Sequence, residues 1–116
     1  MELSLSTRKV EGGVVVFDMK GKLCSGEPLV LLRNAVKQSL DEGATKFVIN
    51  LGEVSYIDSS GLGELVNTFT VLRAKNGAVN LLNLTKRIKD LLQMTKLLTV
   101  FDSFEDEAKA IAKLNG

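Results

Sequence analysis

The sequence has no histidine and no tryptophan, and among its 116 residues it has only one cysteine, Cys24, and one proline, Pro28. Without histidine, neither a Ser-His-Asp nor a Cys-His catalytic arrangement can be built. A zinc site made of histidine and cysteine ligands is excluded for the same reason. Most hydrolase chemistry is therefore ruled out, and we expect no catalytic residue, no metal ion and no cofactor.

Strong charge imbalance and long apolar runs are also missing. The 15 basic and 14 acidic residues give a net charge of +1, which provides no electrostatic footprint for nucleic acid or an anionic membrane. No segment reaches the ~18 apolar residues of a membrane span, and residues 1–9 lack the features of a signal peptide. A single cysteine cannot form an internal disulfide, which fits a reducing compartment. We therefore expect a cytoplasmic protein that neither binds nucleic acid nor inserts into a membrane.

The composition that is present is that of an ordinary globular chain, with 45% hydrophobic and 25% charged residues. A chain of 116 residues is long enough to bury one hydrophobic core and short for two. We therefore expect a single domain over residues 1–116.

The order of apolar patterns predicts an opening β-hairpin followed by alternating helices and strands. Weak alternation over 3–10, a Glu-Gly-Gly turn and a β-branched run over 14–19 indicate the hairpin, and Gly21 marks a break after it. Further strands are predicted at 46–51, 78–82 and 97–101. Helices are predicted at 27–42, at 59–75, after a Thr85 cap, and after a capping box of Ser103 and Asp106. This order favours an α/β fold with a mixed, mostly parallel sheet and helices packed against it.

The segment Asp58-Ser59-Ser60-Gly61-Leu62 is the most informative part of the chain. It follows a strand-like run and opens a strongly amphipathic helical stretch. A helix start carries free N–H groups and partial positive charge, so it would accept an anion such as a phosphorylated serine. Asp58 or Ser59 could equally be a simple N-cap. The residues alone leave both interpretations open.

The predicted helix also has an outer face. A rotation of 100° per residue groups Ser60, Glu64, Asn67 and Val71, opposite an apolar stripe of Leu62, Leu65, Phe69 and Leu72. We expect Val71 to be an apolar side chain that faces outward, although one such residue is also common without any function. The hypothesis is that a protein partner's footprint is flanked by Gly61, Gly63, Glu64, Asn67 and Val71.

Residues 50–63 resemble the signature of the anti-sigma factor antagonists, which belong to the STAS domain family shared with sulphate transporters. The resemblance extends over nearly the whole chain, and Asp-Ser-Ser-Gly-Leu is its specific part. In that family, a partner that is both anti-sigma factor and serine kinase phosphorylates the first serine after the aspartate, and a PP2C-type phosphatase removes the phosphate. The resemblance thus implies that Ser59 is the phosphorylation site, with Asp58, Ser60 and Gly61 as its neighbours. It also implies that the unphosphorylated protein binds the anti-sigma factor and frees sigma.

The chain departs from the family at Cys24, where many members carry an acidic residue soon after the stretch equivalent to 21–23. In the family that loop lies near the phosphorylation site, so Cys24 is either a partner contact or a small half-buried apolar residue. The candidate partner-binding residues are Cys24, Leu62, Gly63, Glu64, Asn67 and Val71. The alternative function is a STAS scaffold or adaptor in a signalling or transport complex, with Ser59 only a cap. We expect a monomer or a weak dimer.

Overall fold

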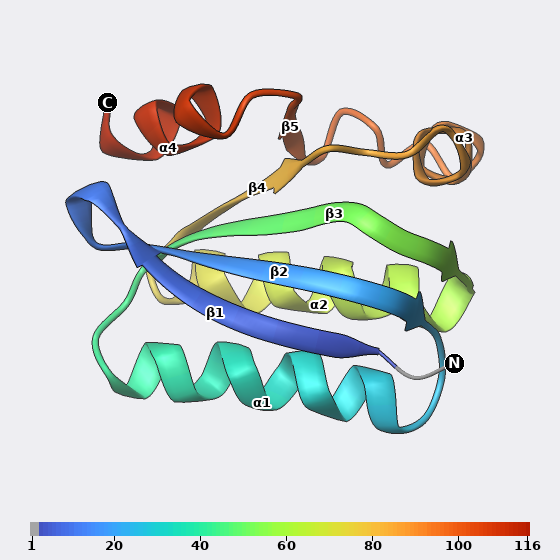
Figure 1. Ribbon diagram of the computed structural model, residues 1–116, viewed down its shortest axis with the longest axis horizontal. Coiled ribbons are helices and arrows are strands. Elements are labelled where there is room, and N and C mark those ends of the chain that lie inside the picture. Colours follow the sequence, from blue (N-terminus) through green and yellow to red (C-terminus); the bar gives the residue numbers. More distant parts are fainter. Residues whose placement is uncertain (1–2) are drawn as a thin grey trace.

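Five strands form one mixed sheet, in the order β1-β2-β3-β4-β5, in the computed structural model, which describes residues 3–116 (Figure 1). The strands are β1 Ser4–Val10, β2 Val14–Leu23, β3 Lys46–Ile57, β4 Ala78–Leu82 and β5 Asp102–Phe104. The β1–β2 pair is antiparallel and the other three pairs are parallel. The predicted α/β fold with an opening hairpin is therefore confirmed. The first two residues of the expected 1–116 domain lie outside the described residues.

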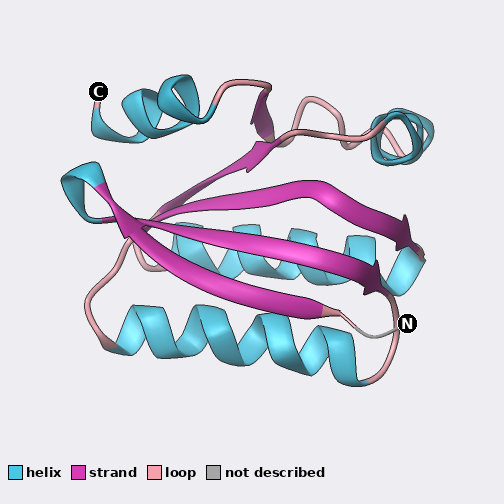
Figure 2. Ribbon diagram, viewed as in Figure 1, coloured by secondary structure: helices cyan, strands magenta, loops and turns pink. Residues whose placement is uncertain are grey.

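Four α-helices cover the sheet, and they are α1 Glu27–Asp41, α2 Ser59–Ala74, α3 Lys86–Met94 and α4 Glu107–Asn115. Helices α1 and α2 lie along one face and α4 lies on the other, whereas α3 lies beyond the end of β4 (Figure 2). A large apolar core fills the α1 and α2 side, and α3 contributes Ile88 and Leu92 to it. A smaller core joins α4 to β2, β3 and β4 through Val14, Val16, Val48, Leu82, Ala110 and Ile111. None of the helices within residues 3–116 is long and apolar enough to span a bilayer.

Strand β3 is the central strand that its apolar run predicted. Phe47 and Ile49 point into the large core, whereas Val48 points into the small one, so the strand is covered on both faces. It continues six residues beyond the predicted end, because its second half pairs with the end of β2. Gly21 accordingly lies inside β2, between two shifts of register, and the expectation that it marks a break is wrong.

The helix predictions hold to within a residue at α1 and α2. Thr85 caps α3 as expected, since its Oγ1 accepts a hydrogen bond from the Ile88 N–H at 3.2 Å. At its other end α2 stops in the predicted Asn76-Gly77 turn, where the Gly77 N–H donates to the Leu72 carbonyl at 2.7 Å. These features depend on neighbouring residues, which is why local patterns predict them.

Two predictions near the C-terminus are wrong. Residues 97–101 form turns that follow α3, because the Leu97 N–H donates to Leu92 O at 2.7 Å and the Val100 N–H donates to Leu97 O at 3.0 Å. These bonds use the donors that a strand would need. The last strand is β5, which includes Ser103, so no capping box forms. Asp106 alone caps α4, and its Oδ1 accepts from the Ala108 N–H at 2.8 Å.

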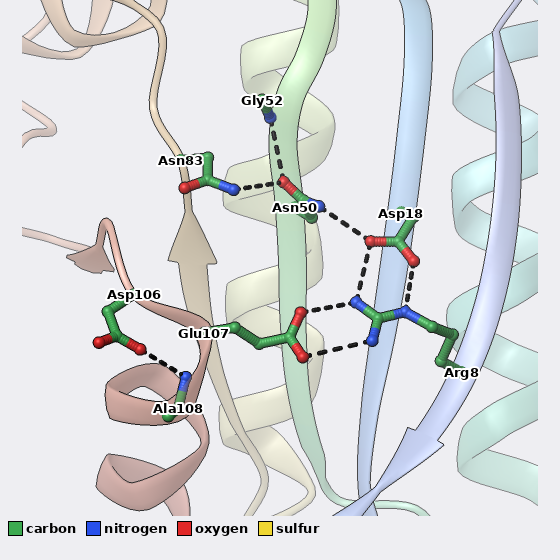
Figure 3. A network of polar contacts seen from close by, with 8 residues as sticks. All are labelled: Arg8, Asp18, Asn50, Gly52, Asn83, Asp106, Glu107 and Ala108. Carbon is green, nitrogen blue, oxygen red and sulfur yellow. Dashed lines mark hydrogen bonds and ion pairs between the residues drawn. The ribbon is translucent and has the colours of Figure 1, made fainter.

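A polar network on the α4 side joins the two ends of the chain (Figure 3). The guanidinium of Arg8 on β1 donates to both carboxylate oxygens of Asp18 on β2, at 2.5 and 3.1 Å. It also donates to both oxygens of Glu107 on α4, at 2.7 and 3.3 Å. Asp18 Oδ1 accepts a further bond from Asn50 on β3 at 2.9 Å. The hydrogen bonds from Arg8 hold the pKa of Asp18 below its usual value.

We expect Asp18→Asn to remove an acid-sensitive part of the stability. Because the native pKa of Asp18 is lowered, its contribution is complete above the unfolded pKa of about 4 and is lost as the pH falls through the native pKa. Because the Arg8–Asp18 pair is half-exposed, we expect Asp18→Asn to lower the free energy of unfolding by less than about 1 kcal/mol at neutral pH. This difference from the wild type should shrink below about pH 4. Urea titrations between about pH 3 and pH 7 measure it, with the exposed Asp41→Asn as control. A difference that does not change with pH would contradict this assignment.

Candidate functional site

The Asp-Ser-Ser-Gly-Leu segment lies at the edge of the sheet where β2 and β3 end and α1 and α2 begin (Figure 1). The two strands are parallel and their ends are in register, with Leu23 beside Ile57. The Asp58 N–H donates to the Leu23 carbonyl at 3.4 Å. The loop that contains Cys24 therefore lies next to the start of α2, and the Cys24 side chain is half-buried there.

Asp58, not Ser59, is the N-cap of α2. Its backbone is extended, and its Oδ1 accepts a hydrogen bond from the Gly61 N–H at 2.8 Å. Ser59 is the first residue of the helix, and both Ser59 and Ser60 are exposed. The aspartate therefore caps the helix, and the Ser59 hydroxyl is not required as a cap.

Gly61 packs directly against the backbone of β2. A Cβ atom at this position would lie 2.1 Å from the Leu23 carbonyl oxygen and 3.0 Å from Cγ1 of Ile57. Only a glycine lets the first turn of α2 come so close to the strand end. Gly63 is different, because it is exposed and a Cβ there would have no neighbouring atom within 4 Å. Gly61 therefore allows the close contact between α2 and β2, whereas Gly63 leaves an exposed surface without a side chain.

Glu64 does not face outward as predicted. Its side chain is only 4% exposed, and its Oε1 accepts a hydrogen bond from Arg33 of α1 at 2.7 Å. Asn67 donates to the other carboxylate oxygen at 3.3 Å. The expectation fails because α1 packs alongside α2, so this part of the helix surface is a contact between two helices. Val71 is half-buried rather than outward-facing.

The six candidate partner-binding residues differ in accessibility. Gly63 and Asn67 are exposed, and Cys24 and Val71 are half-buried. Leu62 and Glu64 are buried, and each whole residue, backbone included, is 5% exposed. The apolar stripe is confirmed at Leu62, Leu65 and Leu72, while Phe69 is half-buried against the core. The accessible surface around Ser59 is therefore smaller than the sequence suggested.

Two further side chains, at the end of β3 and the start of α3, were not predicted from the sequence. The guanidinium carbon of Arg87 on α3 lies 5.6 Å from the centroid of the Tyr56 ring, at the end of β3. The available signal was the pair Lys86-Arg87 directly after the Thr85 cap, because basic residues are unfavourable at a helix start. Near the C-terminus, the Asp106 carboxylate caps α4, whereas the Glu107 carboxylate binds Arg8. Within residues 3–116 no group of histidine, cysteine or acidic side chains could hold a metal ion.

A family model for the STAS domain matches residues 6–110. The anti-sigma-B factor antagonist of Bacillus subtilis is 36% identical over 72 residues, which are 62% of this chain and 65%, or just under two thirds, of that protein. The solved structure of the anti-sigma factor antagonist SpoIIAA in its unphosphorylated form is similar, with a TM-score of 0.76 and 23% identity over 97% of this chain and 99% of that one. The phosphorylated form of SpoIIAA from Bacillus gives 0.73 and 24%, over 95% and 98%. At such identities the two structures show a shared fold.

Replacement of the two glycines by alanine should have opposite effects. Gly61→Ala would push α2 away from the Leu23 carbonyl and should lower the free energy of unfolding by about 2 kcal/mol or more. Gly63→Ala, the matched control in the same helical turn, adds helix propensity in open space and should raise it by about 0.5 to 1 kcal/mol. Urea denaturation followed by circular dichroism distinguishes them. Equal effects of the two substitutions would show that the close approach at Gly61 is not needed.

Proposed function

Because this chain belongs to the STAS domain family, we propose that it is an anti-sigma factor antagonist that phosphorylation of Ser59 switches off. The unphosphorylated protein, a single domain over 1–116, binds an anti-sigma factor that is also a serine kinase, and sigma is released. The kinase phosphorylates Ser59 and ends the interaction, and a PP2C-type phosphatase restores it. The protein's own activity is binding in the cytoplasm rather than catalysis. The observation that carries the proposal is the exposed hydroxyl of Ser59 at a helix start whose cap is Asp58.

The start of α2 can receive a phosphate without refolding. The first N–H groups of a helix have no partner within it, and among residues 3–116 the Asp58 carboxylate accepts a hydrogen bond from the Gly61 N–H alone. A phosphate on Ser59 would bring a charge of about −1.5 to −2 to this positive end of the helix dipole. Ser59 is exposed, so the modification requires no core residue to move.

The same phosphate would act strongly on a bound partner. A surface packed closely against the first turn of α2 would have to remove water from a bulky dianion, which is costly unless basic side chains compensate. The carboxylate of Asp58 directly before it adds charge of the same sign. Phosphorylation can therefore change affinity through local charge alone, while the sheet and the helices keep their arrangement.

The accessible residues suggest where the partner binds. Gly63 and Asn67 lie exposed along the first turns of α2, with Cys24 and Val71 half-buried at the margins. We assign direct contact to these four residues. Leu62 and Glu64 are buried and do not contact the partner in this proposal. Leu62 packs in the core beneath these residues, and Glu64 binds Arg33 of α1.

The proposal predicts phosphorylation at Ser59 and at no other serine. The purified chain is incubated with ATP and each kinase-type anti-sigma factor of the source organism, and the product is mapped by peptide mass spectrometry. Ser59→Ala should abolish the modification, whereas Ser60→Ala, one residue away and also exposed, should retain it. Phosphorylated protein should bind the kinase at least about tenfold more weakly, which corresponds to about 1.4 kcal/mol. A chain that none of the kinases binds or modifies, but that self-associates stably, would favour the scaffold function instead.

A bulky side chain at Gly63 should block the partner without affecting the fold. Because nothing lies within 4 Å of a Cβ at this position, Gly63→Gln should keep the native circular dichroism spectrum. Its extra volume would prevent close packing, so we expect affinity for the anti-sigma factor to fall about tenfold or more. Gly63→Ala is the control for the loss of glycine and should bind nearly as the wild type does. Unchanged affinity of Gly63→Gln in calorimetric titration would place the contact surface elsewhere.

A further inference from the structure

Helix α3 presents a cation to the end of β3. Arg87, in the first turn of α3, places its guanidinium carbon 5.6 Å from the centre of the Tyr56 ring, and the Tyr56 side chain is exposed. Among the ion pairs formed within residues 3–116, none includes Arg87. The aromatic ring thus holds Arg87 in position without neutralising it. Tyr56 comes three residues before Ser59, the proposed phosphorylation site, so the cation lies against the strand that leads into that site.

An open, partly apolar pocket of about 460 Å³ adjoins Arg87. Ile57 at the end of β3 contributes to its lining, together with Leu91 and Met94 of α3 and the charged residues Lys86, Arg87 and Asp90. Met94 is 80% exposed, which is far more than any other large hydrophobic side chain described. A single exposed methionine is ordinary, but this one borders a pocket next to a cation that forms no ion pair within the described part of the chain.

The arrangement of charge along α3 favours an acidic partner. Lys86 and Arg87 occupy the first turn, where the helix dipole disfavours cations. Lys86 is compensated by Asp90, with Nζ and Oδ2 3.1 Å apart, whereas Arg87 has no such partner among the described residues. Arg87, Leu91 and Met94 follow one another at i, i+4 and i+7, so one face of the helix is cationic at its start and apolar towards its end.

We infer that this surface, the α3 patch of Tyr56, Ile57, Arg87, Leu91 and Met94, is a second part of the anti-sigma factor interface. It would bind a segment of that partner in which an aliphatic side chain is flanked by carboxylates. The aliphatic group enters the pocket beside Leu91 and Met94, and a carboxylate pairs with Arg87. The identity of the partner rests on the proposed function, whereas the chemistry of the segment rests on the α3 patch.

Ile57 connects the α3 patch to the phosphorylation site along the chain. Ile57 belongs to the pocket, Asp58 caps α2, and Ser59 begins that helix. One partner can therefore contact the start of α2 and the pocket together. An acidic segment held at Arg87 would also face the phosphate once Ser59 is modified, and repulsion between like charges would strengthen the switch.

The test uses the full chain and a purified kinase-type anti-sigma factor that binds the wild type. Arg87→Glu should bind about tenfold more weakly at about 50 mM salt, and less of this effect should remain at about 500 mM, because salt screens the charge pair. Met94→Asp, which puts a charge at the apolar end of the patch, should bind at least about fivefold more weakly with little dependence on salt. Lys113→Glu is the matched control, an exposed charge reversal on α4, and should stay within about twofold of the wild type.

Loss of the fold would not explain such a result, because Arg87 and Met94 are exposed and a glutamate suits the first turn of α3 better than an arginine does. If Arg87→Glu and Met94→Asp bind as the wild type does, while phosphorylation of Ser59 still weakens binding, the α3 patch is not part of the interface and the proposed function stands. If no kinase-type anti-sigma factor binds the wild type, both are wrong. If Lys113→Glu weakens binding as much as Arg87→Glu does, the change in net charge explains the loss of affinity. That result would also overturn the inference.

Discussion

The close packing of Gly61 against the Leu23 carbonyl is the contact on which the proposed functional surface depends. It brings the first turn of α2 onto the ends of two parallel strands, so the Cys24 loop and the start of the helix share one edge of the sheet. A side chain at this point would separate them, because backbone atoms cannot move aside as the end of a flexible side chain can. The position of Ser59 therefore follows from a steric constraint in the backbone.

Two carboxylates near the start of α2, those of Asp58 and Glu64, form different contacts. The Asp58 carboxylate accepts a hydrogen bond from the Gly61 N–H and completes the cap, so the Ser59 hydroxyl is not needed for capping. Glu64, buried under the exposed surface, is held by Arg33 and so joins α1 to α2. A buried carboxylate is stable only with such a partner. The cap at Asp58 and the contact of Glu64 with α1 are thus both complete without Ser59, so the proposed phosphate would add charge there without breaking either of them.

The opposite side of the sheet is stabilised separately. Arg8 joins β1, β2 and α4 through Asp18 and Glu107, and Asn50 extends the network onto the central strand. None of these residues belongs to the edge of the sheet that carries Ser59. The hairpin and the C-terminal helix are thereby held together by polar contacts, while the proposed partner surface uses the start of α2 and the exposed face of α3. The polar network of Arg8, Asp18, Asn50 and Glu107 thus shares no residue with the proposed partner surface.

The sequence by itself determined what depends on near neighbours: the hairpin, the central strand, the start of α2 after Asp58, the Thr85 cap, and the motif that indicates Ser59 and the STAS family. Only the tertiary structure decided what depends on packing between distant segments. Glu64 is buried because α1 lies against α2, residues 97–101 turn because the end of α3 takes their backbone donors, and Arg87 reaches Tyr56 because α3 lies beside the end of β3. Periodicity shows which residues share a face of one helix, but not what covers that face.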